Sequence, residues 1–172
     1  MKIELKREDI SAADFRFAIV VSRWNDGFTS KLEEGALEAL REAGVVNDAI
    51  ETFRVPGAFE LPLACLKAAE TDEFDAVIAL GVVIRGDTPH FDYVAGEAAS
   101  GISQAALSTG IPVMFGVITA DNVDQVAERC GKKGDNKGYE AAMSAVEMAN
   151  LMREFRDRKW QGFEGMDFPD VV

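Results

Sequence analysis

Residues 79–102 read ALGVVIRGDTPHFDYVAGEAASGI, and this stretch indicates the fold more clearly than any other part of the chain. It begins as an apolar run typical of a buried strand, breaks at Gly86, and continues from Phe91 as a predicted helix. The polar loop between them carries His90, the only histidine in the sequence. His90 is therefore the only candidate for proton transfer by an unperturbed imidazole near pH 7. A loop at the carboxyl end of a strand is also where α/β folds usually place their functional groups.

The rest of the chain repeats this pattern of a strand followed by a helix. Apolar runs predict strands over 15–22, 49–55, 75–84 and 112–119, and helical spacing predicts helices over 28–44, 59–70, 91–109, 122–130 and 139–159. Ser30 and Glu33 form a capping-box pattern near the start of the first helix. Alternation of this kind implies parallel strands joined by right-handed crossovers, with helices on both faces of the sheet.

These elements predict one three-layer α/β/α domain over residues 15–159, built on a four-stranded parallel sheet. An arm over 1–14 precedes it, and a tail over 160–172 with the sequence WQGFEGMDFPDVV follows it. The tail contains acidic and apolar residues but no Lys or Arg. Two interpretations of the tail stay open: a mobile end, or a segment that docks on a neighbouring subunit.

Composition excludes several classes of function. Hydrophobic residues make up 48% of the chain and charged residues 28%, as in ordinary globular proteins. The apolar runs are too short for a membrane span, and the first residues lack the apolar segment of a secretion signal. A formal net charge of −12 argues against nucleic acid or an anionic membrane as a partner. We therefore expect a cytoplasmic protein that acts on small molecules.

The chain contains no residue pattern typical of a metal or thiol site. Cys65 and Cys130 lie far apart, and a single histidine gives them no zinc-binding partner cluster. We expect two buried free thiols, no metal and no cofactor. The sequence also lacks the glycine-rich P-loop and dinucleotide-binding patterns, and the GxSxG pattern of hydrolases.

The loops that follow the predicted strands contain the residues best suited to binding. Trp24 and Asn25 follow the first strand, and they suit either ligand contacts or packing and helix capping. Glu60 follows the second strand and suits either a ligand or the dipole of its own helix. Residues 86–88 form either a plain turn or, with their N–H groups ahead of a helix, an anion site.

Basic residues gather near the last predicted helix. Arg129, Lys132, Lys133 and Lys137 lie within a short segment of an otherwise acidic chain. An arginine suits phosphate because its planar group makes two parallel hydrogen bonds. The alternative is a solvated helix end whose cations complement the dipole.

Five ordered blocks of sequence resemble the 6,7-dimethyl-8-ribityllumazine synthase family over roughly residues 10–155. The blocks are SRWN at 22–25, VPGAFELP at 55–62, ALGVVIRGDTPHFDYV at 79–94, PVMFGVIT at 112–119, and ERCGKKGDNKG at 128–138 with the following SAVEMANL. The resemblance implies a flavodoxin-like fold. It also implies a cofactor-free condensation of 5-amino-6-ribitylaminouracil with 3,4-dihydroxy-2-butanone 4-phosphate. The products would be the lumazine, phosphate and water.

The resemblance also implies roles for individual residues. His90 would transfer protons, and Trp24 would stack on the pyrimidine ring with Asn25 beside it. The ribityl chain would contact Ala58, Phe59 and Glu60, and the uracil edge would contact Val83 and Ile84. The phosphate would be held by Gly86, Asp87, Thr88 and Arg129. Phe115 resembles an aromatic residue that the neighbouring subunit supplies, and Lys137 and Glu140 match positions near the site, with Glu140 orienting His90.

The family places its active sites between adjacent subunits of a pentamer, and some members assemble pentamers into decamers or 60-subunit shells. The turn over 131–138 resembles the short form of shell-forming members. The N-terminal arm would add a strand to a neighbour's sheet. The family also suggests riboflavin synthase as a partner.

Asp87 is the main departure from the family, which usually has a small uncharged residue there. A carboxylate beside a phosphate site is repulsive unless it points away or pairs with a cation such as Arg85. Asp87 thus favours the alternative of a lumazine- or flavin-binding scaffold without catalysis. A third hypothesis, which ignores the family, is a general binder of phosphate ligands.

Overall fold

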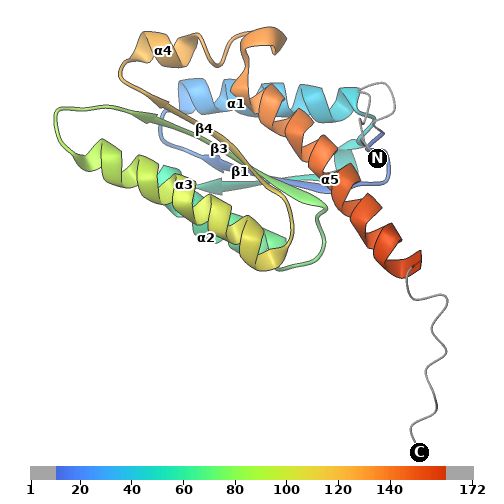
Figure 1. Ribbon diagram of the computed structural model, residues 1–172. Helices are drawn as coiled ribbons and strands as arrows, with labels where there is room; N and C mark the ends of the chain where they lie inside the picture. Colours follow the sequence, from blue (N-terminus) through green and yellow to red (C-terminus); the bar gives the residue numbers. More distant parts are fainter. Residues whose placement is uncertain (1–10, 162–172) are drawn as a thin grey trace, which may run out of the picture.

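The computed structural model describes residues 11–161. Its centre is a sheet of four strands, β1 (Phe17–Ser22), β2 (Ile50–Val55), β3 (Ala76–Ile84) and β4 (Val113–Ala120). The strands lie in the order β2-β1-β3-β4, and every neighbouring pair is parallel (Figure 1). The predicted four-stranded parallel sheet is therefore confirmed, and β2 and β4 form its two edges.

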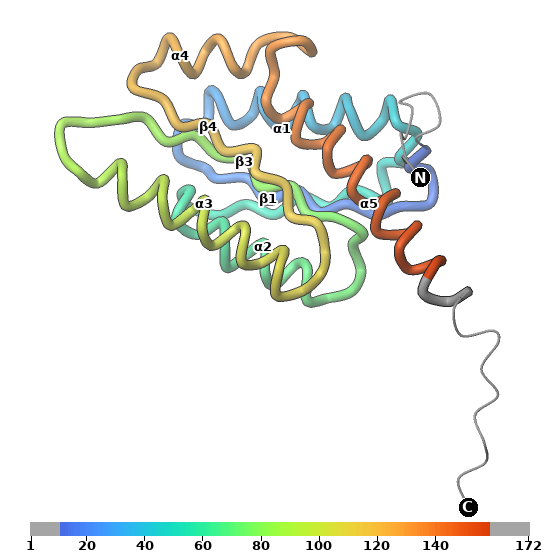
Figure 2. Tube along the Cα trace, viewed as in Figure 1, coloured from blue at the N-terminus to red at the C-terminus, as the bar shows by residue number. Residues whose placement is uncertain are grey.

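Helices cover both faces of this sheet. They are α1 (Asp26–Glu42), α2 (Leu61–Ala69), α3 (His90–Thr109), α4 (Val123–Ala127) and α5 (Lys137–Gln161). Helices α1 and α5 lie on one face, and α2 and α3 lie on the other (Figures 1 and 2). The result is the predicted three-layer, flavodoxin-like arrangement. None of these described helices combines the length and apolar character that crossing a membrane requires.

The side chains of β1 alternate between two apolar cores. Phe17, Ile19 and Val21 pack with α1 and α5, whereas Ala18 and Val20 pack with α2 and α3. All of β1 is buried because helices cover both faces of this central strand. The continuous apolar run FAIVVS is the sequence signature of that double burial.

The predicted capping box at the start of α1 is wrong. The helix begins at Asp26, and Asn25 precedes it in a left-handed conformation with φ 63°. The hydroxyl of Ser30 donates to the Asp26 carboxylate at 3.2 Å, and Glu33 instead pairs with Arg54 of β2 at 2.6 Å. Glu33 can reach Arg54 because it lies on the side of α1 that faces the edge strand β2.

Helix α5 begins with a very close contact to α1. Asn136, just before α5, is buried and donates from Nδ2 to the carbonyls of Lys31 and Gly131 at 2.9 and 3.1 Å. Its Oδ1 accepts the N–H groups of Gly138 and Tyr139 at 2.9 and 3.1 Å. The amide of this one side chain therefore fixes the first turn of α5 against α1.

The predicted arm and tail fall mostly outside the described residues, which begin at 11 and end at 161. Within the described part of the arm, Ala12 is completely buried in the core. Its N–H donates to the carbonyl of Ala43 at 3.0 Å. Residue 12 thus packs with the domain at the end of α1.

Candidate functional site

A cavity of about 230 Å³ opens at the carboxyl ends of β1 and β3, beside the loop that leads into α3. Side chains and backbone from the first three strand-to-helix connections line it. The predicted site residues among them are Trp24, Asn25, Ala58, Val83, Ile84, Gly86, Thr88 and His90. Residues distant in the sequence meet here because the carboxyl ends of parallel strands meet at one edge of the sheet.

Three further residues that line the cavity were not predicted: Val82, Phe91 and Val94. Phe91 is the neighbour of His90, and Val94 lies one helical turn after it. The spacing of four residues between His90 and Val94 is the signal that could have identified Val94, since such pairs share a helix face.

Asn25 connects the ends of β1 and β3. Its Nδ2 donates to the carbonyl of Val82 at 2.9 Å, and its side chain makes no cap on α1. A left-handed backbone is uncommon for residues other than glycine, and asparagine is among those that tolerate it best. Of the two predicted roles of Asn25, helix capping and contact with a ligand, its side chain therefore does not perform the first, and it lines the cavity instead.

Trp24 is a surface residue of the cavity and not a core residue, because its side chain is 62% exposed. Its six-membered ring lies against Gly57, where an added Cβ would approach the ring to 2.7 Å. The N–H of Gly57 donates to Oε2 of Glu60 at 2.8 Å. Glu60 therefore orders the loop that supports Trp24.

Replacing Gly57 with alanine is expected to displace the Trp24 ring and to cost about 1 kcal/mol of unfolding free energy, as overpacking does. The measurement is acrylamide quenching of tryptophan fluorescence with Trp160→Phe as background, because the chain has only two tryptophans. Gly96→Ala is the control, since nothing lies within 4 Å of a Cβ there. Equal quenching in both variants would contradict the contact.

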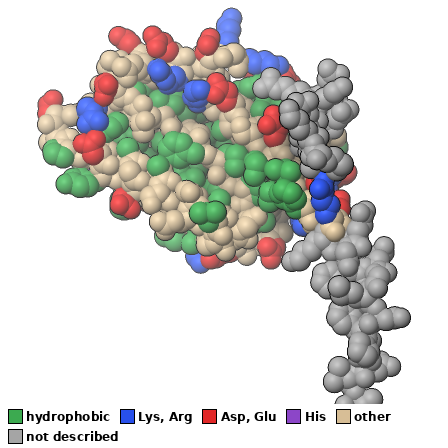
Figure 3. Space-filling view, viewed as in Figure 1, with side chains coloured by type: hydrophobic (Ala, Val, Ile, Leu, Met, Phe, Trp, Pro, Cys, Tyr) green, Lys and Arg blue, Asp and Glu red, His purple; other side chains and the backbone are tan. Residues whose placement is uncertain are grey.

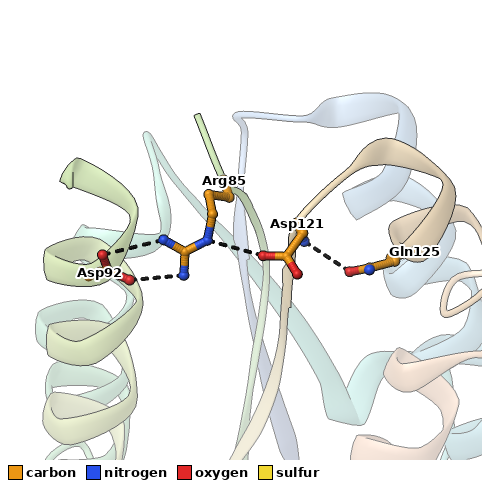
Figure 4. A network of polar contacts seen from close by, with 4 residues as sticks. All are labelled: Arg85, Asp92, Asp121 and Gln125. Carbon is orange, nitrogen blue, oxygen red and sulfur yellow. Dashed lines mark hydrogen bonds and ion pairs between the residues drawn. The ribbon is translucent and has the colours of Figure 1, made fainter. Parts of the chain in front are cut away.

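His90 is the first residue of α3, and it is exposed at the cavity. The preceding Arg85 does not pair with Asp87. Its Nη2 and Nη1 donate to Asp92 at 3.0 and 3.3 Å, and its Nε donates to Asp121 at 3.0 Å (Figure 4). These hydrogen bonds to Asp92 and Asp121 raise the pKa of Arg85. Asp87 is exposed and has no ion pair among the described residues.

The predicted residues that do not line this cavity form two groups. Phe59 and Glu60 in the connection after β2, and Asp87 between Gly86 and Thr88, come from the same loops as lining residues. The second group comes from elsewhere in the chain: Phe115, Arg129, Lys137 and Glu140. Phe115 is on the edge strand β4 and is 45% exposed. Figure 3 shows apolar side chains at the surface on the side that presents β4 and α3. Within one chain, Glu140 binds Lys137 at 2.6 Å and makes no hydrogen bond to His90 in the described part.

The basic segment before α5 is largely engaged with neighbours in the chain. Nη1 of Arg129 donates to the carbonyl of Gln125 at 2.7 Å. Lys133 pairs with Glu42, which also accepts from the hydroxyl of Tyr139 at 2.7 Å. The hydrogen bonds from Lys133 and Tyr139 lower the pKa of Glu42. Nη1 of Arg129 also lies 3.5 Å from Oε2 of Glu128, and this pair is exposed to solvent, where an anion from outside the chain can meet the guanidinium.

Neither cysteine is positioned as a nucleophile. Cys65 and Cys130 are both buried and free, as predicted. Burial raises the pKa of Cys65 to about 12, and the thiol of Cys130 donates to the carbonyl of Val126 at 3.0 Å. Within residues 11–161, no three His, Cys, Asp or Glu side chains come together as a metal site.

Comparison with known proteins gives consistent matches over almost the whole described chain. A family model described as 6,7-dimethyl-8-ribityllumazine synthase matches residues 14–153. A protein of that name from Chlorobium luteolum is 52% identical over 153 residues, which is 89% of this chain and 99% of the relative. Relatives of the same name from Chlorobium phaeobacteroides and Chlorobium chlorochromatii are each 53% identical, over 90% of this chain and 100% and 99% of their own lengths.

Proposed function

This chain belongs to the 6,7-dimethyl-8-ribityllumazine synthase family, and from that membership we propose how its cavity and its exposed edge carry out the reaction. The protein is an enzyme of riboflavin biosynthesis, a transferase that condenses 5-amino-6-ribitylaminouracil with 3,4-dihydroxy-2-butanone 4-phosphate. The observation that carries the proposal is that His90 and predicted residues from three separate loops line the same cavity. The alternative of a non-catalytic scaffold is not favoured.

The pyrimidine substrate is bound between Trp24 and the end of β3. The exposed ring of Trp24 offers a flat surface for stacking, worth about 1 kcal/mol beyond the area it buries. Val83 and Ile84 line the same cavity and contact the uracil edge. Glu60 accepts hydrogen bonds from the ribityl hydroxyls beside Ala58 and Phe59. Since only Oε2 of Glu60 binds Gly57, its other oxygen remains for a ligand.

His90 moves the protons of the condensation. The 5-amino group attacks the ketone, and loss of water leaves an imine. Phosphate is then eliminated, and the enol that remains becomes a ketone. The ribityl-bearing amine attacks this ketone, and loss of a second water completes the ring. Each step removes a proton from nitrogen or carbon and delivers one to a departing oxygen, so one imidazole can alternate as base and acid.

The phosphate is held where the loop over 86–89 enters α3. Gly86 and Thr88 line the cavity just before this 20-residue helix, whose N-terminus favours an anion. Asp87 keeps its carboxylate in solvent, in keeping with its exposure. The cation comes from Arg129, which lies outside the cavity of its own chain.

A complete site therefore forms between two copies of the chain. The family acts on small molecules and forms oligomers. We propose a pentamer in which one subunit supplies the His90 cavity and its neighbour supplies Phe115, Arg129, Lys137 and Glu140. The exposed aromatic ring on the edge strand β4 supports this division. The short turn over 131–138 favours further assembly into a shell.

Two finer proposals concern the setting of the enzyme. We propose a cytoplasmic location, which is supported by two free thiols buried in the domain. Riboflavin synthase is the proposed protein partner, because it consumes the lumazine that this enzyme releases.

The catalytic and scaffold hypotheses are separated by one assay. Lumazine fluorescence and phosphate release are followed together after purified protein is mixed with both substrates. A parallel rise of the two signals supports the synthase. Saturable lumazine binding without phosphate release would support the scaffold and would direct attention to Asp87.

Subunit mixing tests whether the site is shared. His90→Ala and Arg129→Ala proteins are each expected to have low activity, because each loses one half of every site. After the two are dissociated and reassembled at equal ratio, random order in a ring restores about one quarter of the sites. Turnover that stays at the average of the two parents would contradict a shared site. The control is the double variant His90→Ala, Arg129→Ala reassembled with either single variant. No site in these mixtures contains both His90 and Arg129, so no activity should be restored.

A further inference from the structure

Arg85 joins three segments: the end of β3, the first turn of α3 and the residue that follows β4. It follows directly after β3 and precedes the loop over 86–89. Its backbone N–H donates to the carbonyl of Ala120, the last residue of β4, at 2.9 Å. Its side chain reaches Asp92 in the first turn of α3 and Asp121 just after β4 (Figure 4). Asp121 is held in turn, because its N–H donates to Oε1 of Gln125 at 2.9 Å.

The loop over 86–89, between Arg85 and α3, makes few other contacts within the described chain. Residues 86–89 belong to no helix or strand, and no backbone N–H of theirs donates a hydrogen bond within the described chain. A Cβ at Gly86 would have no heavy atom within 4 Å, so the loop is not packed there. The position of His90 therefore depends on how the first turn of α3 is held to the ends of β3 and β4.

Arginine suits this role better than any other cation. Its planar group makes two bonds to Asp92 while its Nε bonds Asp121, which the single nitrogen of lysine cannot reproduce. The same group lies 4.1 Å from the centroid of the Phe91 ring, and Phe91 lines the cavity next to His90. Two of these contacts, with Phe91 and Asp92, are made to the residues that directly follow His90 in the first turn of α3.

We propose that Arg85 is a positioning residue that holds the first turn of α3, and with it the His90 imidazole, in register with the cavity. This inference rests on the proposed role of His90 in proton transfer. A competing role for Arg85 is direct binding of the substrate phosphate. The structure favours positioning, because two carboxylates already engage the guanidinium and leave the group of three side chains with a net negative charge.

The test compares Arg85→Gln and Arg85→Lys in the assembled full-length enzyme, with and without His90→Ala. Arg85→Gln is expected to lower kcat about tenfold, since small displacements of a catalytic group have effects of this order, with KM for both substrates nearly unchanged. Arg85→Lys should recover only part of the rate. In the His90→Ala background Arg85→Gln should cost nothing further, because the two residues act as one unit.

Several results would overturn the proposal. A loss of equal size in both backgrounds would mean that Arg85 acts independently of His90, and a rise confined to KM for the four-carbon phosphate would indicate phosphate binding. An unchanged kcat would also overturn it. Arg158→Gln is the matched control, because Arg158 forms a similarly exposed pair with Glu154 far along α5. Both variants should have similar melting temperatures, since exposed ion pairs contribute little to stability.

Hydrogen exchange separates failure of this inference from failure of the proposed function. Amides over 86–93 should exchange faster in Arg85→Gln than in Arg158→Gln, and unchanged exchange would show that Arg85 does not hold the loop. If His90→Ala alone leaves the rate unchanged, the proton-transfer role fails, whereas the exchange data still decide whether Arg85 orders this segment.

Discussion

Replacing His90 with alanine is expected to slow lumazine formation by about 10²-fold or more, the usual contribution of general acid–base catalysis. No second histidine exists in the sequence to take over the proton transfers. Some activity should remain, because an amine and a ketone condense slowly in water. The measurement is the steady-state rate of lumazine fluorescence, with phosphate release recorded in the same sample.

Binding must be separated from chemistry in this experiment. Affinity of the variant for lumazine should stay close to that of the parent, because Trp24, Asn25 and the end of β3 still line the cavity. Added imidazole should restore part of the rate to His90→Ala by occupying the space that the side chain leaves. His90→Gln, which keeps a polar group but cannot act as a base, should be as slow as the alanine variant. An unchanged rate in both variants would remove His90 from the mechanism.

Replacing Gly138 with alanine is expected to lower the free energy of unfolding by about 3 kcal/mol or to prevent folding, at the upper end of overpacking effects. A Cβ at this position would lie 1.9 Å from the carbonyl oxygen of Leu32 and 2.8 Å from its Cα. These are backbone atoms of α1, so no side-chain rotation relieves the clash. Helix α5 must then separate from α1 at its first turn, where Asn136 holds the two together.

Urea unfolding followed by circular dichroism measures this loss, at one protein concentration because assembly also contributes to stability. Gly134→Ala is the control, because it changes a glycine of the same segment and nothing lies within 4 Å of a Cβ there. The control should unfold within about 1 kcal/mol of the parent. Equal midpoints for Gly138→Ala and Gly134→Ala would contradict the close contact between α1 and α5.

Much of the candidate site could be predicted from sequence because its residues follow the strands. Trp24, Asn25 and His90 were predicted as loop residues at carboxyl ends of strands, and they line one cavity. Val82 and Phe91 were missed, since apolar residues on a strand or helix do not reveal whether they face a core or a cavity, and Val94 was missed although its spacing from His90 indicates a shared helix face. The separation of Phe115 from that cavity was expected from the family and not from spacing, whereas Arg129 was expected beside Gly86 and Thr88 and does not line the cavity with them.

The sequence by itself determined the succession of strands and helices along the chain, because apolar periodicity is a local property. The parallel sheet follows from their alternation. Only the tertiary structure decided which charges pair and where backbones nearly touch. Arg85 binds Asp92 and Asp121 and leaves Asp87 free, and Gly138 lies against Leu32 of a distant helix. Such choices depend on distances between segments remote in sequence, which packing of the two cores sets and no local pattern records.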